Sequence, residues 1–390
     1  ALVGSDATFS AALSRSGVLR VDSITQLFSA AKALSSPRFR GKAERLVIIT
    51  NGGGPGVMAA DRAADLGIEL SSLSQQTITA LNKVLPAVWS KANPVDIIGD
   101  APPERYKQAL EICLNDKAVD GAIIILPPQA MTQPTEVARA IIESVNKSGK
   151  LVLTSWMGGN QIEPARQLFN DAQIPTFRTL ENAVDAFSFL ATYNRNQRLL
   201  MQTPAKRKSG HSSPDKEGAR LIIESALSEG RHVLTELESN AILKAFNIPA
   251  IQIAFANSAN EALIIAETIG FPVAMKILST DISHKSDAGG VRLNIDNAHE
   301  VRSAYREIMD QILEKYPDAK ISGVTIEKMY RSPTGRELMI GILHDPVFGP
   351  VISFGSGGTA VEIMGDSAVA LPPLNQQLAI DLIRQTRVSR

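Results

Sequence analysis

Cysteine is almost absent from this sequence, because Cys113 is the only one among 390 residues. A single cysteine excludes a disulfide framework and a zinc site built from several thiolates, and it fits a reducing cytoplasm. Aromatic residues are also scarce, at 5% of the chain. That scarcity argues against the rows of stacking side chains with which proteins hold single-stranded nucleic acid.

Charge of one sign and long apolar runs are missing as well. The 40 basic and 40 acidic residues cancel, so the chain lacks the positive field that a nucleic-acid partner requires. The longest apolar run, near GAIIILPP, is far shorter than the roughly 20 residues that span a bilayer. We therefore expect neither nucleic acid nor a membrane as a partner. An apolar share of 44% and a charged share of 21% are typical of soluble globular proteins, and the length predicts two or three domains.

Strand and helix patterns alternate from residue 41 onwards. Three apolar runs, RLVIIT (45–50), GAIIILPP (121–128) and KLVLTSW (150–156), are each followed by a turn and an amphipathic segment. Continuous apolar strands between helices indicate a parallel sheet that is covered on both faces. We therefore predict an α/β, flavodoxin-like domain over residues 41–198.

The next part of the chain has the composition of a linker. Residues 203–218, TPAKRKSGHSSPDKEG, are polar, basic and rich in Pro, Ser and Gly. Such a stretch favours a solvated connector, and a basic interaction tail is the alternative. We place the linker at residues 199–232.

A second domain is predicted over residues 233–390, with a mixed α+β pattern. Thr235 with Glu238 predicts a capping box for a helix through Ala245, and Ser258 with Glu261 predicts another for a helix that ends at Gly270. Five strands are expected after these helices, at residues 273–278, 290–295, 323–329, 337–343 and 350–355.

The stretch FPVAMKILSTDISHKSDAGGV carries the strongest chemical signal. Lys276 ends an apolar strand, where an ammonium group needs an anion such as a nucleotide phosphate unless its head reaches water. His284 has a side chain that can carry a phosphoryl group near neutral pH, although a plain surface-loop histidine is the alternative. Gly289 and Gly290 permit positive φ and leave N–H groups free for phosphate, although most glycine pairs are simple turns. The combination favours a phosphate site.

Two glutamates and a second glycine cluster follow. Glu327 and Glu337 lie on successive predicted strands, where they either bracket an adenosine or are ordinary exposed carboxylates. Gly355, Gly357 and Gly358 form either a ligand loop or a tight hairpin that needs positive φ.

The segment NGGGPG (51–56) predicts a second anion site. It follows a strand and opens a helix, so free N–H groups at the helix N-terminus lie at the carboxyl edge of the sheet. The spacing does not match the G-x-G-x-x-G dinucleotide motif. Asn93 and Asp96, in NPVDIIGD, either line the same edge or merely cap a turn.

In combination, these stretches resemble the ADP-forming acyl-CoA synthetases, which are relatives of succinyl-CoA synthetase. The segments that carry the resemblance are ALVGSDATFSAALSRSGVLRVDSITQLFSA, ITNGGGPGVMAAD, NPVDIIGDAPPERY, SWMGG, YNRNQ, DISHKSDAGGV and HDPVFGPVISFGSGG. They cover nearly the whole chain.

The resemblance implies a domain order. Residues 1–40 correspond to the end of a flavodoxin-like domain, 41–198 to the ligase-CoA domain, and 233–390 to an ATP-grasp domain that is incomplete at its C-terminus. The family's CoA-binding Rossmann domain and its main phosphohistidine, in a motif ending S-H-T-G, are expected before Ala1. Its acidic metal-binding motif is expected beyond Arg390, so no metal ligand is assigned here.

The implied reaction is carboxylic acid + CoA + ATP ⇌ acyl-CoA + ADP + phosphate, with Mg²⁺, through an acyl phosphate and a phosphohistidine. The implied partners are the nucleotide, CoA, a small carboxylic acid and the N-terminal CoA-binding domain, with a homo-oligomer as one option. Without that domain and the first histidine, we expect this chain alone not to complete the reaction.

The resemblance also assigns roles by position. It implies a second phosphoryl carrier at His284, ATP contacts at Lys276, Gly289, Gly290, Glu327 and Glu337, and a docking site for the phosphohistidine at Asn51, Gly52, Gly53 and Gly54. A different class of function shares these domains: protein lysine acetyltransferases of the GNAT type, whose synthetase-like region senses acyl-CoA or nucleotide. The full reading frame would discriminate the two.

Overall fold

The computed structural model describes residues 5–37, 43–201, 213–282, 285–330, 332, 334–358 and 365–389. The chain forms two compact units: Ala1–Ala205 together with Glu337–Arg390, and Lys206–Arg336. The chain therefore leaves the first unit, forms the second, and returns to the first. None of the helices in the described ranges is both long enough and apolar enough to cross a membrane.

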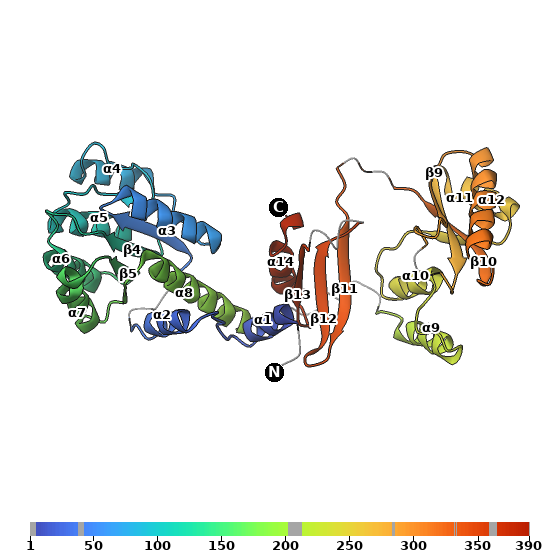
Figure 1. Cartoon of the computed structure of the whole chain (residues 1–390), viewed down its shortest axis with the longest axis horizontal. Coiled ribbons are helices and arrows are strands. Elements are labelled where there is room, and N and C mark those ends of the chain that lie inside the picture. The colour runs from blue at the N-terminus through green and yellow to red at the C-terminus, as the bar shows by residue number, and fades with distance from the viewer. Residues whose placement is uncertain are drawn as a thin grey trace. The chain divides into compact units, whose positions relative to one another are not determined.

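A parallel sheet forms the core of the first unit (Figure 1). Its strands are paired in the order β2-β1-β4-β5-β6, and β3 pairs with the end of β1. The chain fills the sheet first on one side of β1 and then on the other, as in flavodoxin-like folds. This confirms the predicted parallel sheet. The strands are β1 (Arg45–Thr50), β2 (Glu69–Leu70), β3 (Val95–Asp96), β4 (Gly121–Leu126), β5 (Leu151–Trp156) and β6 (Thr176–Phe177).

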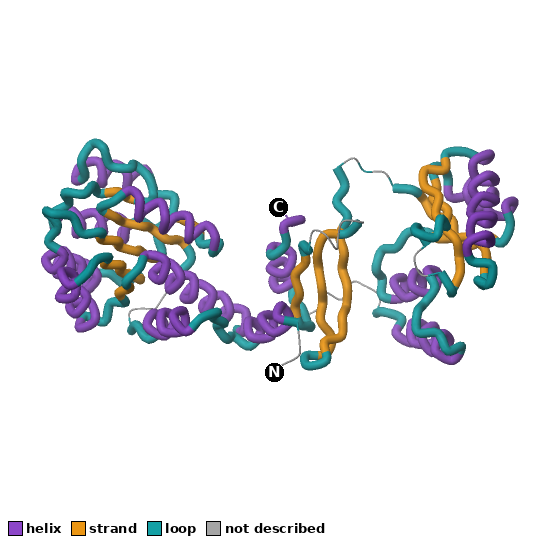
Figure 2. The backbone as a smooth tube through the Cα atoms, viewed as in Figure 1, coloured by secondary structure: helices purple, strands orange, loops and turns teal. Residues whose placement is uncertain are grey.

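Helices cover both faces of this sheet, as the layers in Figure 2 show. One core cluster holds side chains from α4 (Gln75–Val84), α5 (Pro103–Asn115), α6 (Pro134–Lys147) and α7 (Glu163–Asp171). The other holds side chains from α2 (Ile24–Leu34), α3 (Gly53–Asp65) and α8 (Leu180–Leu200). A short 3₁₀ helix, η1 (Asn160–Ile162), precedes α7.

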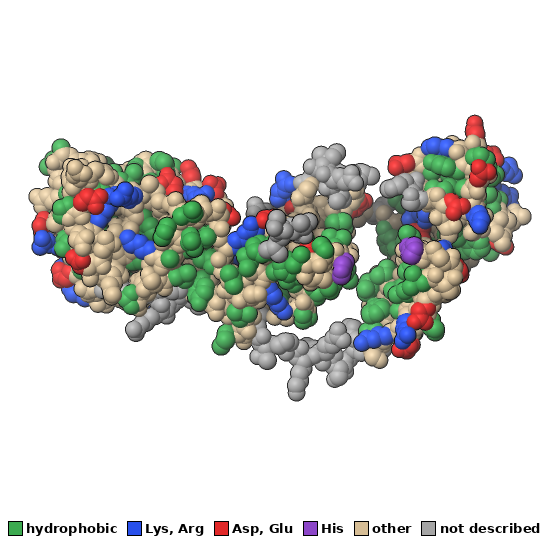
Figure 3. All heavy atoms as spheres, turned by 60° about the horizontal axis from the view of Figure 1, so that its bottom comes forward, with side chains coloured by type: hydrophobic (Ala, Val, Ile, Leu, Met, Phe, Trp, Pro, Cys, Tyr) green, Lys and Arg blue, Asp and Glu red, His purple; other side chains and the backbone are tan. Residues whose placement is uncertain are grey.

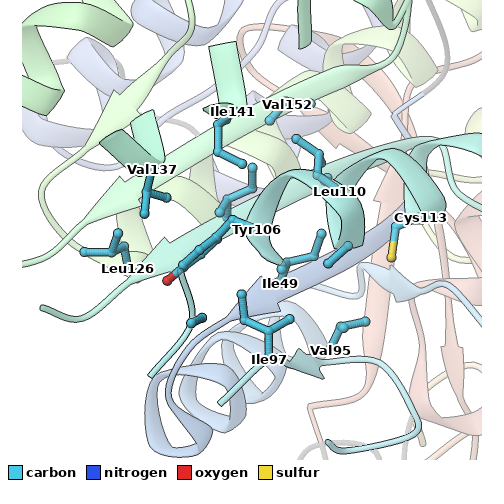
Figure 4. Packing of buried hydrophobic residues seen from close by; sticks show 14 of the residues in the cluster. Ile49, Val95, Ile97, Tyr106, Leu110, Cys113, Leu126, Val137, Ile141 and Val152 are labelled. Carbon is cyan, nitrogen blue, oxygen red and sulfur yellow. The ribbon is translucent and has the colours of Figure 1, made fainter. Parts of the chain in front are cut away.

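The double cover explains why the strands are continuously apolar. In β1, Val47 and Ile49 point into the first cluster, and Leu46 and Ile48 into the second, because successive side chains of a strand point to opposite faces. Figure 4 shows the first cluster, in which Tyr106 lies across the centre with its hydroxyl on the side of Leu126.

The N-terminal helices pack within the first unit. Ala33 of α2 belongs to the second core cluster of the parallel sheet. Residues before the expected domain boundary at residue 40 therefore pack in the same core as residues after it. α1 (Asp6–Arg15) contacts α8 and the C-terminal sheet. The ring centroids of Phe9 in α1 and Phe348 lie 6.4 Å apart.

The C-terminal segment forms a separate antiparallel sheet in the order β11-β12-β13. Its small core contains Phe354, Ala368 and Leu382. Strand β11 carries large apolar side chains that are mostly exposed, such as Ile340 and Ile342 at 75% and 77%. The elements are β11 (Leu338–Asp345), β12 (Gly349–Ser356), β13 (Ser367–Ala370), α14 (Gln376–Arg384) and η2 (Arg387–Ser389).

The second unit contains a four-stranded antiparallel sheet in the order β7-β10-β8-β9. Helices α11 and α12 bury one of its faces, where Met275, Ile277, Val324 and Ile326 lie. The elements are β7 (Ile253–Ala256), β8 (Val273–Ser279), β9 (Val291–Ile295), β10 (Ile321–Lys328), α9 (Lys216–Ser228), α10 (Glu236–Ala245), α11 (Ala259–Ile269) and α12 (Ala298–Lys315).

Both predicted helix starts are present, with one difference. The capping box of Thr235 and Glu238 is complete. Ser258 accepts a hydrogen bond from the N–H of Glu261, but the Glu261 carboxylate accepts from the N–H of Asn257, not from that of Ser258. Helix α11, which Ser258 caps, ends at Gly270, where φ is +82°.

The predicted linker needs a correction over its second half. Residues 202–212 lie outside the described residues, but 216–228 form helix α9. Asp215 caps this helix by accepting a hydrogen bond from the N–H of Gly218, and Ala219 and Ala226 are buried. The polar composition of residues 203–218 concealed this helix, because its large apolar residues begin only at Leu221 and are mostly exposed.

Surface charge is mixed in sign. Figure 3 shows acidic and basic side chains interspersed over the visible face, with hydrophobic side chains between them. This agrees with the zero net charge of the sequence.

Candidate functional site

Four charged side chains meet in the second unit, on the face of its sheet opposite α11 and α12. We name Glu236, Lys276, Lys285 and Glu327 the lysine cluster. Lys276 on β8 stands opposite Thr325 in the antiparallel register of β10, which places Glu327 diagonally across on the same face. The ammonium of Lys276 pairs with the carboxylate of Glu327 and lies 3.3 Å from Oε1 of Glu236. The antiparallel register of β8 and β10 therefore brings Lys276 and Glu327 together as an ion pair.

Lys285 joins the cluster from the turn between β8 and β9. Its Nζ lies 2.7 Å from Oε2 of Glu236. Gly290 donates its N–H to the carbonyl of Lys285 at 2.8 Å, and Gly289 donates to the carbonyl of Ser286 at 3.0 Å. These bonds close the turn and bring Lys285 back beside Lys276.

The same bonds correct one expectation about the glycines. Gly289 and Gly290 were expected to offer free N–H groups to phosphate, but both groups are used inside the turn. Gly289 has φ of +81°, which an L side chain rarely adopts. A β-carbon on Gly290 would clash with Ile277 of β8. The two glycines therefore shape the turn and do not act as donors in this conformation.

Charge pairing outweighs burial in the lysine cluster. Burial alone lowers the pKa of Lys276, but Glu327 and Glu236 outweigh this and the pKa is raised. Burial likewise raises the pKa of Glu236, but Lys285 and Lys276 outweigh it and the pKa is lowered. Both groups are therefore held in their charged forms at neutral pH.

One oxygen of Glu327 has no partner. Glu327 is 7% exposed, and its Oε2 is buried without a hydrogen bond from any residue that the structure describes. An unsatisfied buried carboxylate oxygen is costly. This oxygen is therefore suited to accept a hydrogen bond from a ligand beside Lys276.

Two further predicted residues need separate mention. His284 lies outside the described residues. Glu337 belongs to the first unit, where its carbonyl accepts a hydrogen bond of 2.7 Å from the N–H of Gly357. Its carboxylate lies where a side chain on Gly358, with φ of +84°, would collide with it.

A second site lies in the first unit, where α3 begins. Asn51 directly follows β1, is 1% exposed, and donates from Nδ2 to the carbonyl of Pro127 at 3.0 Å. Its Oδ1 is buried with no partner among the described residues. The N–H of Gly52 donates to Oγ1 of Thr50 at 3.1 Å. In the described part of the chain, the N–H groups of Gly53 and Gly54 have no acceptor, so two donors remain at the helix N-terminus.

The loop after Asn93 borders this helix end. The Asn93 side chain is structural, because it bonds to the backbone of Ile48, Leu46 and Ser71. Asp96 is different: a β-carbon on Gly53 would lie 3.3 Å from its Oδ2. Its Oδ1 accepts from the N–H of Ile98, whose φ is +70°. A β-branched residue in that region is strained, and such strain gathers at functional sites.

The residues present do not define a metal site or a cysteine nucleophile. No group of three His, Cys, Asp or Glu side chains in the described ranges is arranged to hold a metal ion, so we assign no residue to Mg²⁺. Burial, followed by the charge of Asp116, raises the pKa of Cys113 to about 12. A buried thiol with such a pKa is not nucleophilic at neutral pH.

Sequence reasoning missed one member of the lysine cluster. The sequence analysis does not single out Glu236, because no periodicity connects it with lysines 40 and 49 residues away. The strained Ile98 was missed as well, since φ cannot be read from the letters.

These features define a class of protein: an α/β protein with two lysines paired to carboxylates beside one sheet and two N–H groups without an acceptor, among the described residues, at a helix N-terminus. The ligase-CoA domain family matches residues 46–200, and the ATP-grasp domain family matches residues 225–390.

Curated proteins with similar sequences include ADP-forming acetate–CoA ligases. The chain is 35% identical to acetate–CoA ligase (ADP-forming) I of Archaeoglobus fulgidus, over 100% of this chain and 54% of that protein. It is 44% identical to the β subunit of the ADP-forming acetate–CoA ligase I of Pyrococcus furiosus, over 43% of this chain and 72% of the subunit. It is 35% identical to the α subunit of the same enzyme, over 50% of this chain and 42% of the subunit.

The chain belongs to the family of ADP-forming acyl-CoA synthetases. It spans about half the length of the full-length curated relative from Archaeoglobus fulgidus.

Proposed function

We propose that this chain supplies the ligase and nucleotide-binding parts of an ADP-forming acyl-CoA synthetase. The observation that carries the proposal is the lysine cluster, in which two ammonium groups converge beside an unsatisfied buried carboxylate oxygen. Two adjacent cations are suited to a polyphosphate. The substrates of the whole enzyme are ATP, CoA and a small carboxylic acid.

The nucleotide site is assigned to the second unit. Lys276 and Lys285 hold the phosphates of ATP or ADP, and Gly289 and Gly290 hold Lys285 in place through the turn that they form. Glu327 offers its free oxygen to a donor on the nucleotide. Glu337 is proposed at the ribose from the family resemblance alone.

The phosphoryl-docking site is assigned to the start of α3. Asn51 and Gly52 shape the entry to the helix, and the free N–H groups of Gly53 and Gly54 face an incoming phosphoryl group. Aligned N–H groups and the helix dipole stabilise such an anion without reorganisation. The strained Ile98 and the carboxylate of Asp96 border this position.

A phosphoryl relay connects the two sites. A histidine nitrogen attacks the γ-phosphorus of ATP and ADP leaves; His284 is the candidate carrier in this chain, on the basis of the resemblance. The phosphoryl group then passes to the acid carboxylate, and the CoA sulfur attacks the resulting acyl phosphate and releases phosphate. Each site stabilises one transfer, so acid, CoA and nucleotide need not meet in one pocket. Mg²⁺ supplies charge neutralisation at the phosphates when bound.

The cellular location and the partner domain follow from the same proposal. We place the protein in the cytoplasm, where its nucleotide is found and where a lone cysteine stays reduced. A CoA-binding domain is the proposed partner, within the same protein or as a separate subunit. The acetyltransferase alternative is not favoured, because the curated relatives described above are CoA ligases.

The test is nucleotide binding by isothermal titration calorimetry with the complete chain, ATP and Mg²⁺. Lys276→Ala removes one cation from the cluster and leaves Glu327 buried without its partner, so we expect at least about tenfold weaker binding. The control is Lys244→Ala on the exposed side of α10, which should bind as wild type does. Equal affinities of the two variants would refute the assignment.

A further inference from the structure

Glu236 bridges the two lysines of the cluster. It is the first residue of α10, and each of its carboxylate oxygens faces a different lysine: Oε1 is 3.3 Å from Nζ of Lys276 and Oε2 is 2.7 Å from Nζ of Lys285. The side chain is about one-quarter exposed, like those of both lysines. A carboxylate with one oxygen on each cation has the geometry with which a phosphate group would bind the same pair.

The two carboxylates of the cluster differ in how firmly they are held. Glu327 lies on β10, an inner strand of the sheet, is 7% exposed, and among the described residues forms an ion pair with Lys276. Glu236 lies in the first turn of a helix in which only Asn240 is buried. No residue of α10 belongs to the core cluster of this sheet. Glu236 is therefore the carboxylate that can move away without disturbing the sheet.

The charges of the cluster favour replacement of the Glu236 carboxylate by a phosphate group. Two lysines and two carboxylates are neutral together, so a polyphosphate added to the intact cluster would meet the negative charge of Glu236 at close range. If Glu236 leaves, the phosphates gain both ammonium groups and Lys276 keeps its partner Glu327.

We propose that Glu236 is an internal anion that occupies the phosphate position between Lys276 and Lys285 and that nucleotide phosphate displaces it on binding. It keeps both ammonium groups charged and placed before nucleotide arrives, and it sets the affinity by competing for them. Its release removes the ion pairs that connect the first turn of α10 with Lys276 and Lys285. This inference rests on the proposed function and adds a competing residue to that site.

The test compares wild-type protein with Glu236→Gln by calorimetric titration of the complete chain with ATP and Mg²⁺. The amide keeps the size of the side chain but removes the charge, so binding should tighten about threefold or more. The matched control is Glu238→Gln, which removes one charge from the same helical turn. Glu238 pairs with Arg231 and not with the lysines, and glutamine can keep its place in the capping box, so this variant should bind as wild type does.

Each outcome has a distinct meaning. Unchanged affinity of Glu236→Gln would show that the carboxylate does not compete, and weaker binding would show that it assists; either overturns the inference. Circular dichroism and melting of each variant confirm that it is folded. Failure of the proposed function looks different, because wild-type protein would then not bind ATP, or would bind it independently of Lys276.

Discussion

At the scale of single residues, the proposed nucleotide site depends on which face of a strand each side chain occupies. Lys276 was predicted from the sequence, since an ammonium at the end of an apolar strand needs an anion. Its partner could not be predicted, because Glu327 becomes its neighbour only through the antiparallel register of β8 and β10. The sequence predicted that Glu327 and Glu337 lie on successive strands, where they could bracket an adenosine, whereas the structure places these residues in different compact units.

The glycines of the turn provide a prediction at this scale. Gly290→Ala introduces a β-carbon that clashes with Ile277 of β8, and backbone displacement in a packed region costs about 1–3 kcal/mol. We expect the melting temperature of the second unit to fall, and ATP to bind more weakly because Lys285 is displaced. The measurements are thermal melting by circular dichroism and calorimetric titration with ATP.

Gly149→Ala is the control for that variant, because a β-carbon at Gly149 would meet open space and its φ is not positive. It should melt and bind as wild type does. If Gly290→Ala behaves like the control, the turn is not held as tightly as the structure indicates.

At the scale of elements, the sequence predicted the strands and helix starts well because their signals are local. Apolar runs gave β1, β4 and β5, and the capping box of Thr235 and Glu238 gave the start of α10. Helix α9 was missed because the polar composition outweighed its apolar residues. The α3 N-terminus was predicted from its glycines, but the buried, unpartnered Oδ1 of Asn51 depends on the approach of Pro127 from the loop after β4.

A pH dependence is expected where α4 begins. Burial alone would raise the pKa of Asp116, but hydrogen bonds from the N–H of Ala118, the hydroxyl of Thr77 and the N–H of Ser74 lower it to about 2. A lowered folded-state pKa stabilises the fold above the unfolded value near 4, and this contribution is lost as pH falls towards 2.

Asp116→Asn tests this contribution. We expect the first unit of the variant to be less stable than wild type at pH 7, by on the order of 1 kcal/mol, and the difference to shrink by pH 3. Urea unfolding followed by tryptophan fluorescence reports on this unit, since both tryptophans, Trp89 and Trp156, are buried in its core. Asp310→Asn, on the exposed side of α12, is the control. A difference that stays constant with pH would contradict the account.

At the scale of the whole molecule, the two proposed anion sites lie in two separate compact units. The four residues of the lysine cluster lie within Lys206–Arg336, and the start of α3 lies within Ala1–Ala205. The sequence predicted an ATP-grasp domain over 233–390, and that family matches residues 225–390. In the structure, strands β11–β13 of this stretch form their own sheet, which packs within the first unit. Such long-range packing leaves no local signal, because it depends on which surfaces meet after the elements have formed.

The central claim is that the lysine cluster holds the phosphates of a nucleotide. It is tested most directly with an ATP analogue that carries a reactive acyl group on its terminal phosphate and transfers it to any lysine beside that phosphate. After digestion, mass spectrometry of the complete chain should find the label on Lys276 or Lys285, and excess ATP should suppress it. Labelling of other lysines alone, or labelling that ATP does not suppress, would contradict the claim.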